Sequence, residues 1–372
     1  MEMAATLDRA ALKRKIRVRA LRYMVSFAGP LLAWVSFTYH GWLSWALVIQ
    51  GFVLVPVIEL MHRPRHLALS EEEESAALDD PLYDVLLYVL VPMQWALLVY
   101  FLFSVGQPDL TLWERIGRTA SMGILCGVYG INVAHELGHR ARRWERDLAR
   151  ALLLTSLYTH FIIEHNRGHH KRVATPEDPA SARYGESVYA FWIRTLVFSF
   201  LSAWGLERAR LHKEGHAIFS LRNEMLRGLL FEAMLMAVIG YFFGWQVLLA
   251  FLIAAFIGML LLETVNYIEH YGLQRVRTAT GTFGRVQHVH SWNSDLLPGR
   301  IFLFELTRHS DHHYKASRKY QILASSQTAP QLPAGYPGMM ILSLIPPLWF
   351  AVMNKRVVAL AAQEPEVVLA QT

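Results

Sequence analysis

The sequence predicts an all-α integral membrane protein with six transmembrane helices. Of its 372 residues, 53% are hydrophobic and 18% are charged, whereas an ordinary soluble domain carries about 25% charged residues. Several apolar stretches are long enough to cross the hydrocarbon core of a bilayer, which is about 30 Å thick, as helices. This composition excludes a disordered chain and, despite the net charge of +6, a nucleic-acid-binding protein.

Six apolar segments are the expected transmembrane helices. They cover residues 23–39, 42–58, 82–103, 113–134, 225–243 and 245–262. Very short turns, at His40 with Gly41 and at Gly244, join two pairs of them. Polar residues interrupt the apolar pieces 151–163 and 189–204, so we expect core or interfacial helices there. The piece 339–352 contains Pro346 and Pro347 and is also expected at the membrane interface.

The distribution of basic residues predicts the orientation in the membrane. The N-terminal arm is strongly basic, whereas the turns at residues 40–41, 106–112 and 244 contain no Lys or Arg. The positive-inside rule therefore places the N-terminus in the cytoplasm, and six crossings return the C-terminus to the same side. The expected regions are the arm (1–22), helices one to four (23–139), a cytoplasmic middle region (140–224), helices five and six (225–270) and a cytoplasmic C-terminal region (271–372).

Nine of the 17 histidines fall in four short motifs on the expected cytoplasmic side. The motifs are HELGH (135–139), EHNRGHH (164–170), NYIEH (266–270) and HSDHH (309–313). Helical residues three or four positions apart share a face. This spacing predicts three pairs that point together: His135 with His139, His165 with His169, and His309 with His312.

These nine histidines are the candidate metal ligands. They are His135, His139, His165, His169, His170, His270, His309, His312 and His313. Nine imidazoles exceed the needs of one ion, so we expect a dinuclear site held in a cytoplasmic cap of helices and loops. Imidazole binds Zn, Cu, Fe and Ni alike, so spacing alone does not name the metal.

The other eight histidines are not expected to bind metal as a group. His62 with His66 and His212 with His216 have ligand-like spacing but no third partner nearby in the sequence. We expect structural roles for His40 and His160, and His288 and His290 are intermediate cases.

Acidic residues beside the motifs are candidates for orienting the imidazoles, because a ligating histidine usually donates its other ring N–H to an acceptor. Four of them adjoin a candidate ligand directly, and Glu263 lies seven residues before His270 on the same helical face. The five are Glu136, Glu164, Glu263, Glu269 and Asp311.

The same motifs resemble those of the integral-membrane alkane 1-monooxygenases (alkane ω-hydroxylases), relatives of the membrane fatty-acid desaturases. The matching segments are HELGHR (135–140), EHNRGHH (164–170), NYIEHYGL (266–273), LTRHSDHH (306–313) and PQLPAGYPGM (330–339). Three histidine boxes alone would fit desaturases, and the NYIEHYGL and RHSDHH segments narrow the resemblance to the alkane hydroxylases. It covers most of the chain from the third expected helix onward.

The resemblance implies a non-haem di-iron centre, O₂ as the oxidant and a linear alkane that is hydroxylated at its terminal methyl group. It implies an enzyme of the inner membrane with no flavin or haem, and no catalytic residue beyond the metal ligands is expected. Electrons would come from rubredoxin, with an NAD(P)H-dependent rubredoxin reductase behind it. Rubredoxin must be a separate protein, because its iron needs four cysteines and this chain has only Cys126.

Basic residues close to the histidine motifs are candidates for docking an acidic rubredoxin. They are Arg140, Arg143, Lys171, Arg172, Lys315, Arg318 and Lys319. Positive-inside orientation and contact with anionic lipid explain some of these charges equally well.

Three other functions fit parts of the pattern. A desaturase or a hydroxylase of aryl-methyl groups would share the scaffold. A membrane zinc protease would use His135 and His139 as ligands and Glu136 as base, but it leaves seven clustered histidines unexplained. A metal transporter would need ionisable ligands near the middle of the membrane, where these segments carry few.

Overall fold

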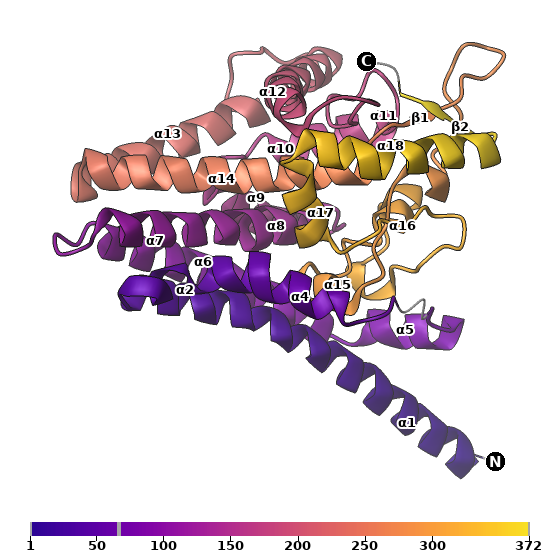
Figure 1. Ribbon diagram of the computed structural model, residues 1–372, viewed down its shortest axis with the longest axis horizontal. Coiled ribbons are helices and arrows are strands. Elements are labelled where there is room, and N and C mark those ends of the chain that lie inside the picture. The colour runs from indigo at the N-terminus through magenta and orange to yellow at the C-terminus, as the bar shows by residue number, and fades with distance from the viewer. Residues whose placement is uncertain (1, 65–67, 371–372) are drawn as a thin grey trace.

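The computed structural model describes residues 2–64 and 68–370 and is mostly helical (Figure 1). His66 of the pair His62/His66 lies outside the described residues. The α-helices of the N-terminal half are α1 (Glu2–Leu21), α2 (Ala28–Thr38), α3 (Ala46–Ile49), α4 (Val55–Leu60), α5 (Glu71–Asp79), α6 (Leu82–Val105), α7 (Leu112–Leu125), α8 (Asn132–Gly138), α9 (Arg143–Leu154), α10 (Phe161–Glu164) and α11 (His170–Arg172). Those of the C-terminal half are α12 (Val188–Lys213), α13 (Glu224–Phe243), α14 (Trp245–His270), α15 (Leu297–Phe302), α16 (His309–Tyr314), α17 (Tyr336–Ser343) and α18 (Pro346–Gln363).

Short π-helical turns, a small sheet and the 3₁₀ helices η1 (Arg22–Phe27), η2 (Gly41–Trp45), η6 (His288–His290) and η7 (Tyr320–Ile322) complete the described structure. The π-turns are η3 (Gln50–Leu54), η4 (Cys126–Ile131) and η5 (His165–His169). Strands β1 (Leu273–Arg275) and β2 (Val367–Leu369) pair in an antiparallel register that sets Gln274 opposite Val368. This pairing ties the end of the chain to the segment that follows α14.

Within residues 2–64 and 68–370, six helices are long and apolar enough to span a membrane. They are Arg9–Thr38, Gly41–Leu60, Leu82–Val105, Val188–Lys213, Glu224–Phe243 and Trp245–His270. The prediction of a helical membrane protein with six candidate spans is therefore confirmed, with five spans at the expected places.

The expected fourth span, residues 113–134, is not one of the six. It forms α7, η4 and α8 in succession, which run beside α14 through the middle of the molecule (Figure 1). Arg115, Arg118 and Asn132 lower its hydropathy, and neighbouring helices rather than lipid surround most of it. Glycines let the backbones approach closely, since a Cβ at Gly123 would overlap Ile257 of α14. A helix enclosed by protein does not need an apolar surface, and because this segment runs beside the candidate span α14, its crossing of the membrane stays a prediction.

Helix α12 is the sixth candidate span instead, and it corrects the expectation of a short apolar piece at 189–204. It is one continuous helix of 26 residues. Before its first turn, the Glu186 carbonyl accepts a hydrogen bond from Tyr267 at 2.6 Å. Near its other end, Glu207 pairs with Arg167 at 2.8 Å. Both ends thus contact segments that carry histidine motifs, so α12 lies across the end of α14 rather than along it.

The C-terminal apolar piece, expected at 339–352, is broken as its prolines suggest. Helices α17 and α18 meet at 120°, and Pro346 and Pro347 open α18. Trp349 of α18 is buried against Tyr267 and Tyr271 at the end of α14. The C-terminal region therefore packs as a cap over the end of the bundle where α14 stops.

Candidate metal centre

All nine candidate histidines meet at the end of the bundle where α8 and α14 stop. Helices α8 and α14 end at this level, and η5, α11 and α16 bring in the other motifs from two distant parts of the chain. The structure divides the nine into two sets. Within each set, every histidine offers one ring nitrogen, and these nitrogens all lie within 4.8 Å of one another. Set A is His135, His139, His165, His170 and His312, and set B is His169, His270, His309 and His313.

In set A, the Nε2 atoms face a common centre. Three of them form a closed triangle: His139 to His165 is 3.1 Å, His165 to His170 is 3.0 Å and His139 to His170 is 3.2 Å. His312 continues the ring, with its Nε2 at 2.9 Å from His135 and 3.1 Å from His170. A neutral imidazole offers one N–H and one lone pair, so ring protons cannot satisfy all sides of such a triangle.

In set B, the histidine Nε2 atoms face one another in the same way. The distances are 3.2 Å from His169 to His313, 2.7 Å from His313 to His309 and 3.2 Å from His309 to His270. With metal–nitrogen bonds of about 2.1 Å, as zinc forms with imidazole, two ligand nitrogens at right angles lie about 3.0 Å apart. Both sets therefore have the spacing of nitrogens that share a cation.

The π-turn η5 decides which histidine joins which set. The α-helical periodicity predicted that His165 and His169 point together, but a π-turn pairs residues five apart. His165 and His170 consequently share set A, and His169 turns to set B. The expected pairing of His309 with His312 is also wrong, because His309 pairs with His313 across one α-helical turn and His312 faces set A.

Burial favours the neutral form of these imidazoles, and it prevails in every one of them except His169. It lowers the pKa of His139 to about 3, and it lowers the pKa values of His165 and His312 as well. A metal binds the neutral imidazole, so a low pKa leaves the lone pair available at physiological pH.

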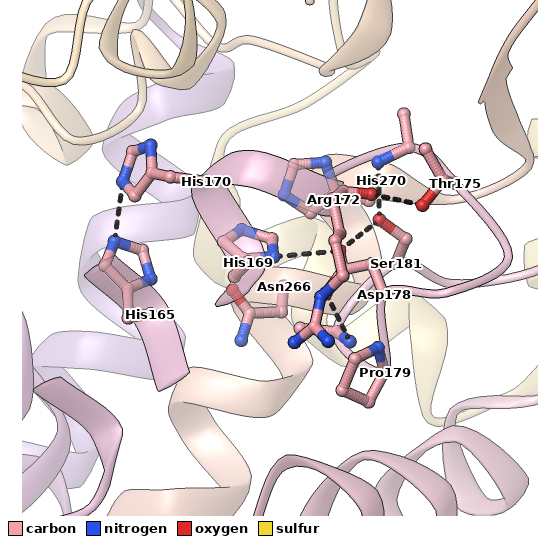
Figure 2. A network of polar contacts seen from close by, with 12 residues as sticks. His165, His169, His170, Arg172, Thr175, Asp178, Pro179, Ser181, Asn266 and His270 are labelled. Atoms are coloured by element: carbon pink, nitrogen blue, oxygen red, sulfur yellow. Dashed lines mark hydrogen bonds and ion pairs between the residues drawn. The ribbon is translucent and has the colours of Figure 1, made fainter. Parts of the chain in front are cut away.

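His169 has a carboxylate partner that the sequence analysis missed. Burial alone would lower the pKa of His169, but the adjacent charge of Asp178 raises it overall. Asp178 Oδ2 lies 2.9 Å from His169 Nδ1 and accepts a second hydrogen bond from Ser181 Oγ at 2.6 Å, as Figure 2 shows. Asp178 lies in a loop nine residues after His169, where no helical period relates the two. Ser291 Oγ, 3.3 Å from His270 Nδ1, was missed for the same reason.

One of the five predicted acidic residues touches a clustered imidazole. Glu269 Oε2 lies 3.1 Å from His309 Nε2, and Glu269 Oε1 accepts a hydrogen bond from Tyr336 at 2.6 Å. Glu164 accepts the backbone N–H of His169 at 3.1 Å and pairs with Arg172. Both carboxylates therefore contact histidines of set B and help to hold them in place.

The other three acidic residues have other partners. Glu136 pairs with Arg140 at 2.8 Å and accepts the backbone N–H of Tyr320. Glu263 binds Tyr158 and Thr195. Asp311 binds His288 and Arg318. Because Glu136 is paired with Arg140 and Tyr320, it is not placed to act as the base that a zinc protease would need.

The predicted docking residues separate into three groups. Arg140 is 6% exposed and paired with Glu136 and Asp84, which places it inside the protein and corrects its assignment to a docking surface. Four further members lie beside carboxylates. Arg172 binds Glu164, Arg318 binds Asp311 and Lys319 binds Asp84. Arg143 is exposed and lies 3.9 Å from Asp147. Lys171 and Lys315 are exposed.

None of the described histidines outside the nine joins either set. His62 contacts the carbonyl of Ile58, and His216 contacts Arg222. His288 lies beside Asp311 at 3.3 Å, and His290 contacts the carbonyl of Glu366. His160 is buried between Tyr158 and Phe200.

An apolar cavity of about 110 Å³ lies between the helices of the bundle, and none of the nine histidines is among its lining residues. Its walls come from η3, η4, α14, α15 and α17. Three lining residues lie within five positions of a clustered histidine: Asn132 before His135, Val265 before His270 and Leu306 before His309. A fourth, Tyr336, reaches set B through Glu269. The cavity therefore lies close in the sequence to three of the histidine motifs, although none of the nine histidines lines it.

Comparison with known proteins agrees with this arrangement. The model of the fatty acid desaturase family matches residues 113–342. Alkane 1-monooxygenase 1 of Pseudomonas aeruginosa is 40% identical over 350 residues, which cover 90% of this chain and 91% of that protein. Alkane 1-monooxygenase of Acinetobacter baylyi is 40% identical over 82% of this chain and 74% of its own length. The hydroxylase component of xylene/toluene monooxygenase from Pseudomonas putida is 26% identical over 90% of this chain and 88% of its own.

The match of the family model spans more than half of the chain, and the two alkane 1-monooxygenases described above align along most of it. The chain belongs to the fatty acid desaturase family and, within it, to the alkane 1-monooxygenases.

Proposed function

We propose that this protein hydroxylates the terminal methyl group of linear alkanes to primary alcohols, with O₂ as the oxidant. The observation that carries the proposal is the pair of buried histidine sets in a helix bundle whose apolar cavity is lined by residues within five positions of three histidine motifs. A terminal methyl group offers no acidic proton, leaving group or dipole, so acid–base catalysis cannot attack it. The names of the relatives, alkane 1-monooxygenases, support the same substrate class.

Two iron ions are the metals that this function requires, one in each set. Five and four imidazoles fit two such cations in number and spacing. Zinc has no redox chemistry, whereas iron when bound would supply the activation of O₂ that no side chain provides. The chain's own residues would hold the ions, orient the imidazoles through Asp178 and exclude water from both sets.

The cavity would bind the alkane and aim its end at the metals. Leu47, Ile124 and Leu262 line it along the bundle, where a hydrocarbon is removed from water without any polar contact. Tyr336 lines the cavity and also contacts Glu269, which lies against His309. Glu269 Oε2 has no hydrogen-bond partner among the described residues apart from this approach to His309, so it could carry a proton to or from the reacting centre.

Electrons would come from a separate rubredoxin that docks on the cap. Lys171 and Lys315 each lie within two residues of a clustered histidine and are exposed, which leaves them available to an acidic partner. This arrangement supports an orientation with the cap and both termini in the cytoplasm, in the inner membrane. The apolar substrate and the water-soluble donor would then approach the metals from opposite sides.

The test is metal analysis of the purified protein together with product analysis. We expect about two Fe per chain, and primary alcohols from linear alkanes when rubredoxin and its reductase are supplied. One Zn per chain without Fe would contradict the proposal. The relative that acts on xylene and toluene favours a second candidate, hydroxylation of aryl-methyl groups. Turnover of xylene without turnover of any linear alkane would select that function instead.

A further inference from the structure

We propose that a groove between α9 and α13 binds an anionic phospholipid, with the phosphate at one end and an acyl chain along the other. The groove has a volume of about 560 Å³. Its basic lining residues Arg143, Arg146 and Arg227 come earlier along these segments than its apolar lining residues Leu154, Ile163 and Phe231. It shares no residue with set A or set B.

The two helices run in the same direction along the groove, which separates its charged end from its apolar end. Arg150 of α9 contacts Glu224 at the start of α13 at 3.2 Å. Farther along both segments, Thr159 contacts Glu232 at 2.6 Å. On α9 the groove residues change from Arg143 to Leu154, and on α13 from Arg227 to Phe231, so both helices turn from cationic to apolar along the same axis.

The charged end has a surplus of positive charge. The two acidic residues in it are already bound, because Asp147 pairs with Arg150 at 2.8 Å and Glu224 pairs with Arg150 and Arg167. Arg143 Nε lies 3.9 Å from Asp147 and its side chain is 86% exposed. Arg146 donates to two backbone carbonyls, those of Arg140 and Ala141. No ion pair is formed by Arg227 among the described residues, so two or three guanidinium groups remain available to a phosphate.

The apolar end opens toward the surface that faces lipid. Helix α13 is a candidate span in which only 11% of the most apolar window is buried inside the protein. Phe231 and its neighbour Leu230 are about half exposed, at 51% and 49%. A soluble acidic protein would match the charge of the arginines. It would not, however, supply an acyl chain to cover the apolar part of the groove on α13. Basic pockets between membrane helices are known binding places for anionic lipid head groups.

Native mass spectrometry of the detergent-purified protein tests the proposal, with phosphatidylglycerol as the probe. Phosphatidylcholine with the same acyl chains and inorganic phosphate serve as the two comparison ligands. We expect one phosphatidylglycerol to be retained at concentrations where phosphatidylcholine is lost. Each basic side chain near an anionic membrane surface contributes about fivefold in affinity, so Arg143→Gln/Arg227→Gln should weaken retention roughly 25-fold.

Two variants control for loss of charge and for misfolding. Arg208→Gln/Lys213→Gln removes the same charge from exposed positions of α12 outside the groove and should retain the lipid. Arg143→Lys/Arg227→Lys keeps the charge and should bind more tightly than the glutamine variant. Equal retention by the glutamine variant and the wild type would overturn the proposal. So would equal binding of phosphatidylcholine, full competition by inorganic phosphate at matched concentration, or displacement of the lipid by an acidic rubredoxin.

Discussion

Replacement of Asp178 by asparagine tests how the protein orients a metal ligand through a residue that the metal would not touch. Asp178 is 1% exposed and lies 2.9 Å from His169 Nδ1. Burial alone would raise the pKa of Asp178, but the charge and hydrogen bond of His169 hold it at about 2, so the carboxylate is ionised. Asparagine keeps the shape and one acceptor oxygen but removes the charge that strengthens the bond to the imidazole N–H.

The expected loss is 10–100-fold in the affinity of set B for iron. Partners of ligating histidines typically contribute about this much to metal affinity or activity, which corresponds to about 1.4–2.8 kcal/mol. We expect the upper part of the range, because Asp178 is buried and no solvent can replace its charge. Ser291→Ala should cost less than tenfold, since the hydroxyl contacts His270 at 3.3 Å and is neutral.

The assay is anaerobic titration of the metal-free protein with Fe(II) against a competing chelator. Asp109→Asn is the matched control, because it makes the same chemical change at an exposed carboxylate far from the centre. An unchanged unfolding temperature of metal-free Asp178→Asn would separate the loss of affinity from a folding defect. Wild-type affinity in Asp178→Asn would refute the reasoning and would leave Asp178 with the role of shaping the loop through Ser181.

Three further results are expected. Gly51 lines the cavity, and the nearest atom to a Cβ there would be 4.0 Å away. Gly51→Leu should therefore fold and shift the preferred alkanes to shorter chains. An unchanged product profile would place the alkane elsewhere. Lys171→Glu/Lys315→Glu should raise the KM for rubredoxin and reduce its dependence on salt, with no change in iron content; an unaltered KM would move the docking surface. His270→Ala should abolish hydroxylation and lower iron content, whereas His212→Ala should do neither.

The sequence by itself determined the class of protein and the histidines of its candidate metal centre. Hydropathy reports the free energy of moving each segment from water to lipid, so five of the six candidate spans were predicted at their places. Histidine spacing reports which residues can share a helical face, and all nine predicted ligands meet in the structure. Both are local properties of the chain, which is why they can be read without knowledge of the fold.

Only the tertiary structure decided how these parts are combined. The π-turn η5 sent His169 and His170 to different sets, and no sequence period specifies a π-turn. Asp178 lies in a loop that brings it to His169, and buried Arg140 pairs with Asp84 of the earlier helix α6. Helix α7 was placed inside the bundle despite its charges because α14 and its neighbours surround it. Each of these features depends on contacts between segments distant in the chain, whose free energy is set by packing and burial rather than by any residue's own preference.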